Sequence, residues 1–216
     1  MDKKQILWID NTKAIGIFLV LLAHHHINPV YMQYIYSFHM PLFFFISGYL
    51  FDSSKHPDFK GFLKRKLKTL ILPYFISAFT SFLFWLVIVR KFSIYGESLK
   101  ISPIKPFLGI FHSNGHGNWK LPIDTALWFL TCLFVVEILF WIINKISPNK
   151  IASGLFILGS AILGYIGSLF IPFRLPWSID IALTAMAFYG IGYIFKDKLD
   201  TLTDFAANKK LRRVIP

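Results

Sequence analysis

Long apolar windows recur along the sequence and constrain its fold more than any other feature. A helix that crosses the hydrocarbon core of a bilayer needs roughly 20 mostly apolar residues. Windows of about this kind lie at 6–27, 34–51, 67–89, 126–144, 151–171 and 179–195. In addition, only 16% of the residues are charged, against about 25% in an ordinary soluble domain. The sequence therefore predicts an all-α, polytopic transmembrane helix bundle with about six spans.

The single cysteine and the N-terminus exclude some alternatives. Cys132 lies inside the fourth window, so the chain has no intramolecular disulfide, no CxxC redox motif and no thiolate metal site. Lysines precede the first window, as in a secretory signal. However, LLAHHHINP is a poor cleavage site, and a second window follows at once. We therefore expect a retained first helix.

The distribution of charge predicts the topology. A net charge of +12 would suggest a nucleic-acid partner in a soluble protein, but here it is unevenly placed. If six spans alternate, 17 of the 23 Lys and Arg residues lie on the side of the N-terminus, and five of the other six lie in the connection 90–125. The positive-inside rule then places both ends of the chain in the cytoplasm. The charge fits anionic lipid or substrate, and we expect no nucleic-acid partner.

Residues 1–195 are expected to form one membrane-embedded domain, followed by a polar cytoplasmic segment at 196–216. The long connection 90–125 is rich in Gly, Pro, Ser and Asn and is predicted to be extracytoplasmic. Long loops of mixed aromatic and polar content are often functional.

Ionisable side chains lie at both ends of the first window, in the stretch DNTKAIGIFLVLLAHHH. Lys13 and His24 are 11 residues apart, so on a regular helix they point within about 20° of each other, about 16 Å apart along the axis. Asp10 precedes Lys13 by one turn and can neutralise it. His25 and His26 are rotated by about 100° and 200° from His24, so the three imidazoles cannot address one point. His24 is the strongest functional candidate, because an ionisable residue inside a span is costly.

The second window, YIYSFHMPLFFFISGYLF, carries His39. It lies about one and a half turns into the span, from the outer side that His24 also approaches, so two imidazoles can meet at similar depth. An interhelical hydrogen bond accounts for His39 as well as a functional role does.

Four further residues are candidates for substrate binding or for structure. Ser47 belongs to a small, weakly polar patch. Trp128 fits the aromatic belt of a membrane interface as well as a site. Glu137 and Asp180 lie within or beside spans, where each either lines a polar cavity or pairs with a neighbouring helix.

These residues resemble the motifs of the acyltransferase family 3 membrane proteins. IDNTKAIGIFLVLLAHHH is similar to the family's opening motif, an aspartate, a basic residue and an apolar run that leads to a histidine 11 residues after the basic one. SFHMPLFFFISGYLF, LWFLTCLFVVEI and LPWSIDIALTAMAFYGIGYIF resemble the fucose 4-O-acetylase-like branch, in the expected order over residues 8–195. Family members usually have about ten spans, so the resemblance implies that this chain corresponds to their N-terminal part and is incomplete.

The resemblance implies a plasma-membrane O-acetyltransferase that moves an acyl group from cytosolic acyl-CoA to a hydroxyl of a cell-surface sugar or glycan. His24 matches the family's essential histidine, and Lys13 matches its basic partner, which is usually arginine. LKRKLKTLILPY matches the family's basic cluster only in part, with Arg65 between two lysines. Acetyl-CoA is then a donor substrate, and no cofactor is bound permanently.

In this interpretation His24 is the general base on the acceptor hydroxyl, because imidazole titrates near neutral pH. The other members of the predicted catalytic set are Lys13, Asp10 and His39. Donors near His39, Ser47 or Trp128 stabilise the thioester oxyanion. The donor phosphates contact the cytoplasmic basic residues by charge-assisted hydrogen bonds; these residues are Lys13, Lys64, Arg65 and Lys68.

Two other functions remain open. A proton-coupled transporter of a glycan or small acid would use a cavity lined by His24, His39, Glu137 and Asp180. A membrane-embedded haem or metal site would use the first two of these. In HSNGHG, His112 and His116 alone are too few ligands for a metal. Consumption of the thioester distinguishes the enzyme from the transporter.

Overall fold

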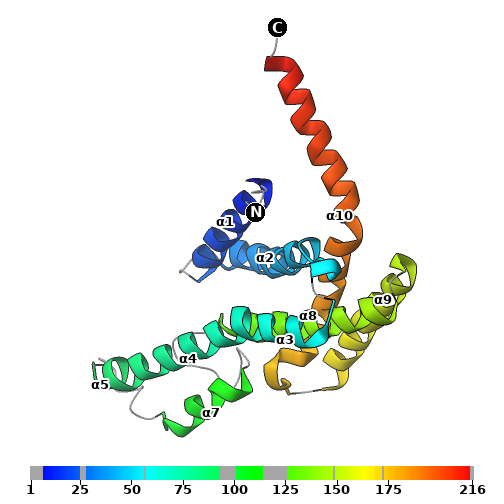
Figure 1. The fold of residues 1–216 in the computed structure, drawn as a ribbon. Helices are drawn as coiled ribbons and strands as arrows, with labels where there is room; N and C mark the ends of the chain where they lie inside the picture. Colours follow the sequence, from blue (N-terminus) through cyan, green and yellow to red (C-terminus); the bar gives the residue numbers. More distant parts are fainter. Residues whose placement is uncertain are drawn as a thin grey trace. The chain divides into compact units, whose positions relative to one another are not determined.

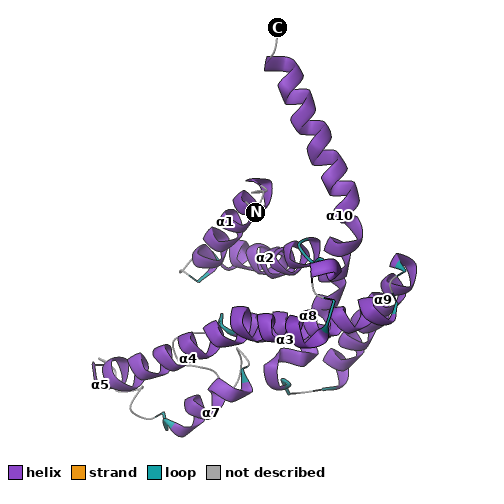
Figure 2. Cartoon of the chain, in the orientation of Figure 1, coloured by secondary structure: helices purple, strands orange, loops and turns teal. Residues whose placement is uncertain are grey.

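The computed structural model describes residues 7–24, 28–55, 57–92, 101–113, 126–147, 149–171 and 173–214, and these ranges contain helices and no strand (Figures 1 and 2). The predicted all-helical fold is confirmed. The chain divides into two compact units: unit 1 comprises Met1–Phe51 and Ala187–Pro216, and unit 2 comprises Asp52–Met186.

Unit 1 contains α1 (Leu7–Ala23), α2 (Pro29–Tyr49) and the greater part of α10 (Ile179–Val214). A strong local signal starts α2: Asn28 accepts the N–H of Val30 at 2.9 Å, and Pro29 occupies the first turn. α10 runs without interruption across the predicted boundary at residue 195, and that boundary stays a prediction.

Glycines let the helices of unit 1 approach closely. Gly16 of α1 faces the Phe43 ring of α2. A Cβ at Gly48 would overlap the carbonyl group of Tyr189 on α10. Conversely, a Cβ at Gly192 of α10 would overlap the carbonyl group of Phe45 on α2. α2 and α10 therefore touch backbone to backbone, through small residues as in many membrane helix pairs.

We expect Gly48→Ala to destabilise unit 1 by about 1–3 kcal/mol, because the new methyl group meets backbone that cannot move alone. Gly159→Ala is the matched control, since a Cβ there has nothing within 4 Å. Helix propensity predicts that this control is neutral or stabilising, by up to about 1 kcal/mol. Thermal unfolding of the two variants in lipid, followed by circular dichroism, measures both effects. Equal midpoints would contradict the close α2–α10 contact.

Unit 2 begins with η1 (Ser53–Lys55) and a nearly continuous helical stretch, α3 (Phe59–Lys66), the π-helical η2 (Leu67–Ile71), α4 (Leu72–Phe84), the π-helical η3 (Trp85–Val89) and α5 (Arg90–Phe92). It continues with α7 (Ile104–His112), α8 (Trp128–Ile146), α9 (Lys150–Phe170), η5 (Pro176–Ser178) and the start of α10. Side-chain caps start two of these helices: Asp58 accepts the N–H of Gly61 at 2.6 Å, and Asn149 accepts that of Ile151 at 3.0 Å.

The core of unit 2 joins α4 and η3 to α7. Its buried residues are Tyr74, Ala78, Phe82, Trp85 and Ile110. The Tyr74 hydroxyl donates to the Ile110 carbonyl at 2.6 Å, so the polar end of this ring is satisfied inside the core. α7 lies inside the connection 90–125, which was predicted to be a long loop, and this packing ties it to the helical stretch that precedes the connection.

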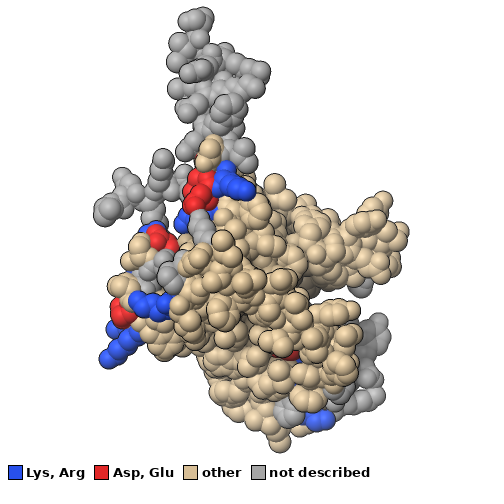
Figure 3. Space-filling view, turned by 90° about the vertical axis from the view of Figure 1, so that its right-hand side faces the viewer, with Lys and Arg blue, Asp and Glu red and all other residues tan. Residues whose placement is uncertain are grey.

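Four helical stretches are long and apolar enough to cross a membrane: Phe59–Phe92, Trp128–Ile146, Ile151–Phe170 and Pro176–Thr201. They coincide with the last four predicted windows. The first two windows are also helical, as α1 and α2, but these helices are not among the four found in the described residues. The face in Figure 3 is mostly uncharged. Large exposed apolar side chains follow the helices, as lipid contact requires; examples are Ile15, Phe18, Leu21, Leu155, Leu163 and Leu169.

Candidate active site

Two histidines of the predicted site, His24 and His39, lie in unit 1, and each uses Nδ1 to contact a backbone carbonyl. His24 follows the last turn of α1, is exposed, and has its Nδ1 2.8 Å from the carbonyl oxygen of Val20. His39 is buried in α2, with its Nδ1 2.6 Å from the carbonyl oxygen of Ile35. A carbonyl can only accept, so Nδ1 carries the proton in each neutral ring. Nε2 of each ring therefore carries the lone pair.

Tyr36 of α2 lies between these two imidazoles. Its ring centroid is 6.3 Å from that of His24, edge to face, and 5.4 Å from that of His39. Its hydroxyl donates to the carbonyl oxygen of Ala23 at 3.2 Å, which ties α2 to the end of α1. The structure thus brings His24, Tyr36 and His39 together as one histidine cluster. Tyr36 was not predicted from the sequence, although it precedes His39 by one helical turn.

The other predicted residues of unit 1 are spread along α1 and α2. Lys13 is half-buried and Asp10 is exposed on α1, and no ion pair joins them in the described part of the chain. Ser47 donates to the carbonyl oxygen of Phe43 at 2.8 Å, one turn earlier in α2. These positions leave the roles of the three residues as predictions.

The predicted phosphate contacts of unit 2 lie at the junction of α3 and η2. Lys64, Arg65 and Lys68 are all exposed there. Lys66, among them, is different: its Nζ lies 2.5 Å from Oε2 of Glu137 on α8, and the two side chains are only 19% and 7% exposed. Of the two interpretations of Glu137, the structure therefore shows pairing with a neighbouring helix.

Two stacked aromatic rings lie beside Lys66. The Lys66 ammonium lies 5.5 Å from the ring centroid of Phe62, within range of a cation–π contact. The Phe62 ring in turn stacks on Trp141 of α8, with centroids 5.9 Å apart. Lys66 was not predicted as a site residue. The signal that could have found it is the carboxylate inside a predicted span, which commonly pairs with a nearby cation.

At the start of α8, Trp128 is half-buried and joins a hydroxyl network through its backbone. Its carbonyl oxygen accepts the hydroxyl of Thr131 at 2.9 Å. The Thr131 oxygen lies 2.7 Å from that of Ser113, and the Ser178 hydroxyl donates to the Ser113 carbonyl at 3.5 Å. All three hydroxyl residues are buried. They connect the ends of α7 and η5 to α8.

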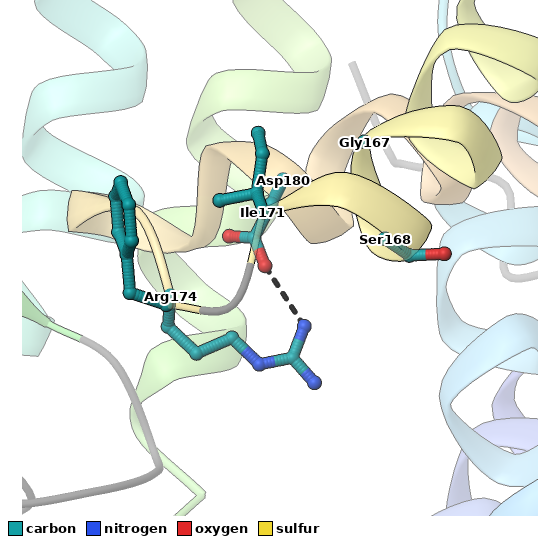
Figure 4. Close-up of a pocket in the computed structure, with 6 residues that line it drawn as sticks. Gly167, Ser168, Ile171, Arg174 and Asp180 are labelled. Atoms are coloured by element: carbon teal, nitrogen blue, oxygen red, sulfur yellow. Dashed lines mark hydrogen bonds and ion pairs between the residues drawn. The ribbon is translucent and has the colours of Figure 1, made fainter.

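Asp180, in the first turn of α10, pairs with Arg174 and also lines a pocket (Figure 4). Nη1 of Arg174 lies 2.8 Å from Oδ2 of Asp180. A polar cavity and pairing with a neighbouring helix were the two alternatives predicted for Asp180. In the structure it lines a pocket, and its ion-pair partner Arg174 lies in the link before α10, not on a neighbouring helix.

His25, His26 and His116 are outside the described residues. His112 is the last residue of α7. Within the described ranges, no group of three or more His, Cys, Asp or Glu side chains is placed to hold a metal ion.

The sequence of the whole chain was compared with known proteins. The family model described as an acyltransferase domain matches residues 6–215. No curated protein and no solved structure shows a significant match to the chain. The matched segment includes the histidine cluster, the Lys66–Glu137 pair and the pocket at Asp180. Four membrane-length helices in such a chain indicate a membrane protein with an acyltransferase function. The chain belongs to acyltransferase family 3.

Proposed function

We propose that this protein is an O-acetyltransferase of the fucose 4-O-acetylase-like branch, which moves an acetyl group from cytosolic acetyl-CoA to a hydroxyl of a cell-surface sugar or glycan at the plasma membrane. The observation that carries the proposal is the state of His24. Its Nδ1 is hydrogen-bonded to the Val20 carbonyl, so the exposed imidazole offers a basic Nε2, within a chain matched by an acyltransferase family over 6–215.

In the proposed reaction, Nε2 of His24 takes the proton from the acceptor hydroxyl as its oxygen attacks the thioester carbonyl. The tetrahedral intermediate then collapses. The carbon–sulfur bond breaks, the acetyl ester forms on the acceptor, and the imidazolium returns its proton to the departing CoA thiolate. The hydrogen bond from Nδ1 to Val20 holds the ring orientation through both proton transfers.

The remaining residues of the histidine cluster support His24 in this proposal. The Tyr36 ring packs edge to face against the His24 ring, and its hydroxyl donates to the Ala23 carbonyl. Tyr36 therefore limits rotation of the imidazole. His39 is buried behind Tyr36, and its Nε2 is a second acceptor available for a hydroxyl proton.

The donor is assigned to basic residues. Lys64, Arg65 and Lys68 are exposed at the start of a membrane-length helix, where their charges attract the phosphates of acetyl-CoA. Lys66 is excluded from this role, because its ammonium is paired with Glu137. Lys13 keeps its predicted role as a donor contact from α1.

Membranes carrying the protein test the function directly. We expect radiolabelled acetyl-CoA to release CoA, with the label appearing in the glycan fraction as a base-labile ester. Membranes without the protein are the control. A transporter of glycans or small acids would leave acetyl-CoA intact, so an unconsumed thioester in membranes with inserted protein would contradict the proposal.

A further inference from the structure

The link between α9 and α10 forms a pocket of mixed polarity (Figure 4). Its volume is 320 Å³, within the range of about 300–1,000 Å³ that is usual for ligand sites. Its lining residues are Gly167, Ser168, Ile171, Phe173, Arg174 and Asp180. None of them belongs to the histidine cluster or to the basic residues assigned to the donor.

The polar side of the pocket presents donors and acceptors together. Arg174 uses Nη1 to bind Oδ2 of Asp180 at 2.8 Å, and the N–H of Leu175 donates to the other carboxylate oxygen at 3.3 Å. The Arg174 guanidinium has five N–H donors in all. The Arg174 side chain is 48% exposed, whereas that of Asp180 is 11% exposed. Arg174 can therefore keep the ion pair and still donate to a ligand.

The remaining side chains that line the pocket are apolar or carry a hydroxyl group. Phe173 is 65% exposed, and Ile171 is partly exposed. The Ser168 hydroxyl donates to the carbonyl oxygen of Tyr165 at 2.6 Å, which leaves its oxygen as an acceptor. A ligand with apolar faces and a rim of hydroxyl groups would satisfy both sides.

The segment that carries Arg174 and Asp180 is held in a strained backbone conformation. Trp177 and Ser178 have φ values of 58° and 53°, which cost free energy for residues other than glycine. Trp177 donates its indole N–H to the Phe111 carbonyl at 3.0 Å, and Ser178 joins the hydroxyl network. Contacts with α7 and α8 therefore fix this turn before any ligand binds.

We propose that this pocket binds a sugar unit of the carbohydrate acceptor through a pair of neighbouring hydroxyl groups, which accept from the remaining N–H groups of Arg174 and donate to the Asp180 carboxylate of the intact ion pair. The ion pair has no net charge, so it offers little to a free anion, whereas its donors and acceptors match adjacent hydroxyls. The Phe173 ring covers the apolar face of the sugar. The inference rests on the proposed function for the acceptor class, and the predicted topology places the link between α9 and α10 outside the cell.

The test measures sugar binding without requiring catalysis. The full chain is reconstituted in lipid nanodiscs free of glycoside detergents, which would compete for the pocket. Methyl glycosides of glucose, galactose and fucose serve as probes in saturation-transfer NMR, which detects weak ligands. We expect at least one of them to bind.

Variants locate the binding. Arg174→Ala and Asp180→Asn should weaken the affinity about tenfold or more, because each removes a charged hydrogen-bonding partner. The matched pair is Ser168→Ala and Ser160→Ala. Both serines lie on α9 and donate to the carbonyl three residues earlier, but only Ser168 lines the pocket. We expect weaker sugar binding by the Ser168→Ala protein alone. This result would exclude a general effect of such substitutions on folding.

Three results would overturn the inference: no binding of any glycoside, equal binding by the Ser168→Ala and Ser160→Ala proteins, or displacement of the sugar by inorganic phosphate at millimolar concentration. Failure of the proposed function is a separate result. Pocket-dependent sugar binding in a protein that does not consume acetyl-CoA supports the pocket and removes the acetyltransferase proposal.

Discussion

Replacement of His24 by alanine is expected to reduce acetyl transfer by about 10²–10⁴-fold, the usual contribution of a positioned general base. The structure provides the reason. The Nδ1–H of His24 donates to the Val20 carbonyl, so Nε2 is the basic atom. Alanine has no basic atom to take its place. His24→Gln, which keeps the polar size but cannot accept a full proton at neutral pH, should be nearly as inactive.

The measurement is the rate of label transfer from acetyl-CoA to glycan, normalised to protein inserted in the membrane. His112→Ala is the control, because this histidine ends α7 in unit 2 and belongs to no part of the proposed site. Undiminished acetyl transfer by inserted His24→Ala protein would contradict the assignment of His24 as the general base.

Breaking the Lys66–Glu137 pair has the second large expected effect, on stability. Removing one partner, as in Lys66→Met or Glu137→Leu alone, leaves the other charge almost buried and unpaired, which costs about 3–5 kcal/mol. Replacing both partners by apolar residues of similar size, as in Lys66→Met with Glu137→Leu, should cost much less, because no charge then remains in the helix packing. The coupling between the two positions is the test.

Cys132 makes this measurement direct. It is the only cysteine of the chain, it is fully buried, and it lies on α8 with Glu137. A thiol-reactive fluorescent dye therefore reports the unfolding of this helix on heating. Lys68→Met is the matched control, because Lys68 is exposed and its loss should change stability by no more than about 0.5 kcal/mol. A double variant as unstable as the sum of the two single variants would contradict the ion-pair interpretation.

The helical fold and its membrane class were determined by local properties of the sequence. An apolar stretch of spanning length can satisfy its backbone only as a helix in a bilayer, and four predicted windows became membrane-length helices. The family was also readable, because its motifs lie on contiguous stretches of chain. The match over 6–215 confirms the family, while the branch stays a prediction.

The candidate sites depended on contacts between residues far apart in sequence, which no window of sequence contains. The sequence left Glu137 with two interpretations, and only the packing of α8 against the α3–η2 junction selected Lys66. It proposed that His24 approaches His39 but did not predict Tyr36 between them.

Arg174 shows the same division. In the sequence it was one of six cations predicted on the outer side, and only the structure shows its pairing with Asp180. The sequence by itself therefore determined which segments are helical and apolar, because those properties are local. The tertiary structure alone decided which polar side chains share a partner, because an ion pair or a pocket is formed by side-chain positions that the packing of distant segments sets.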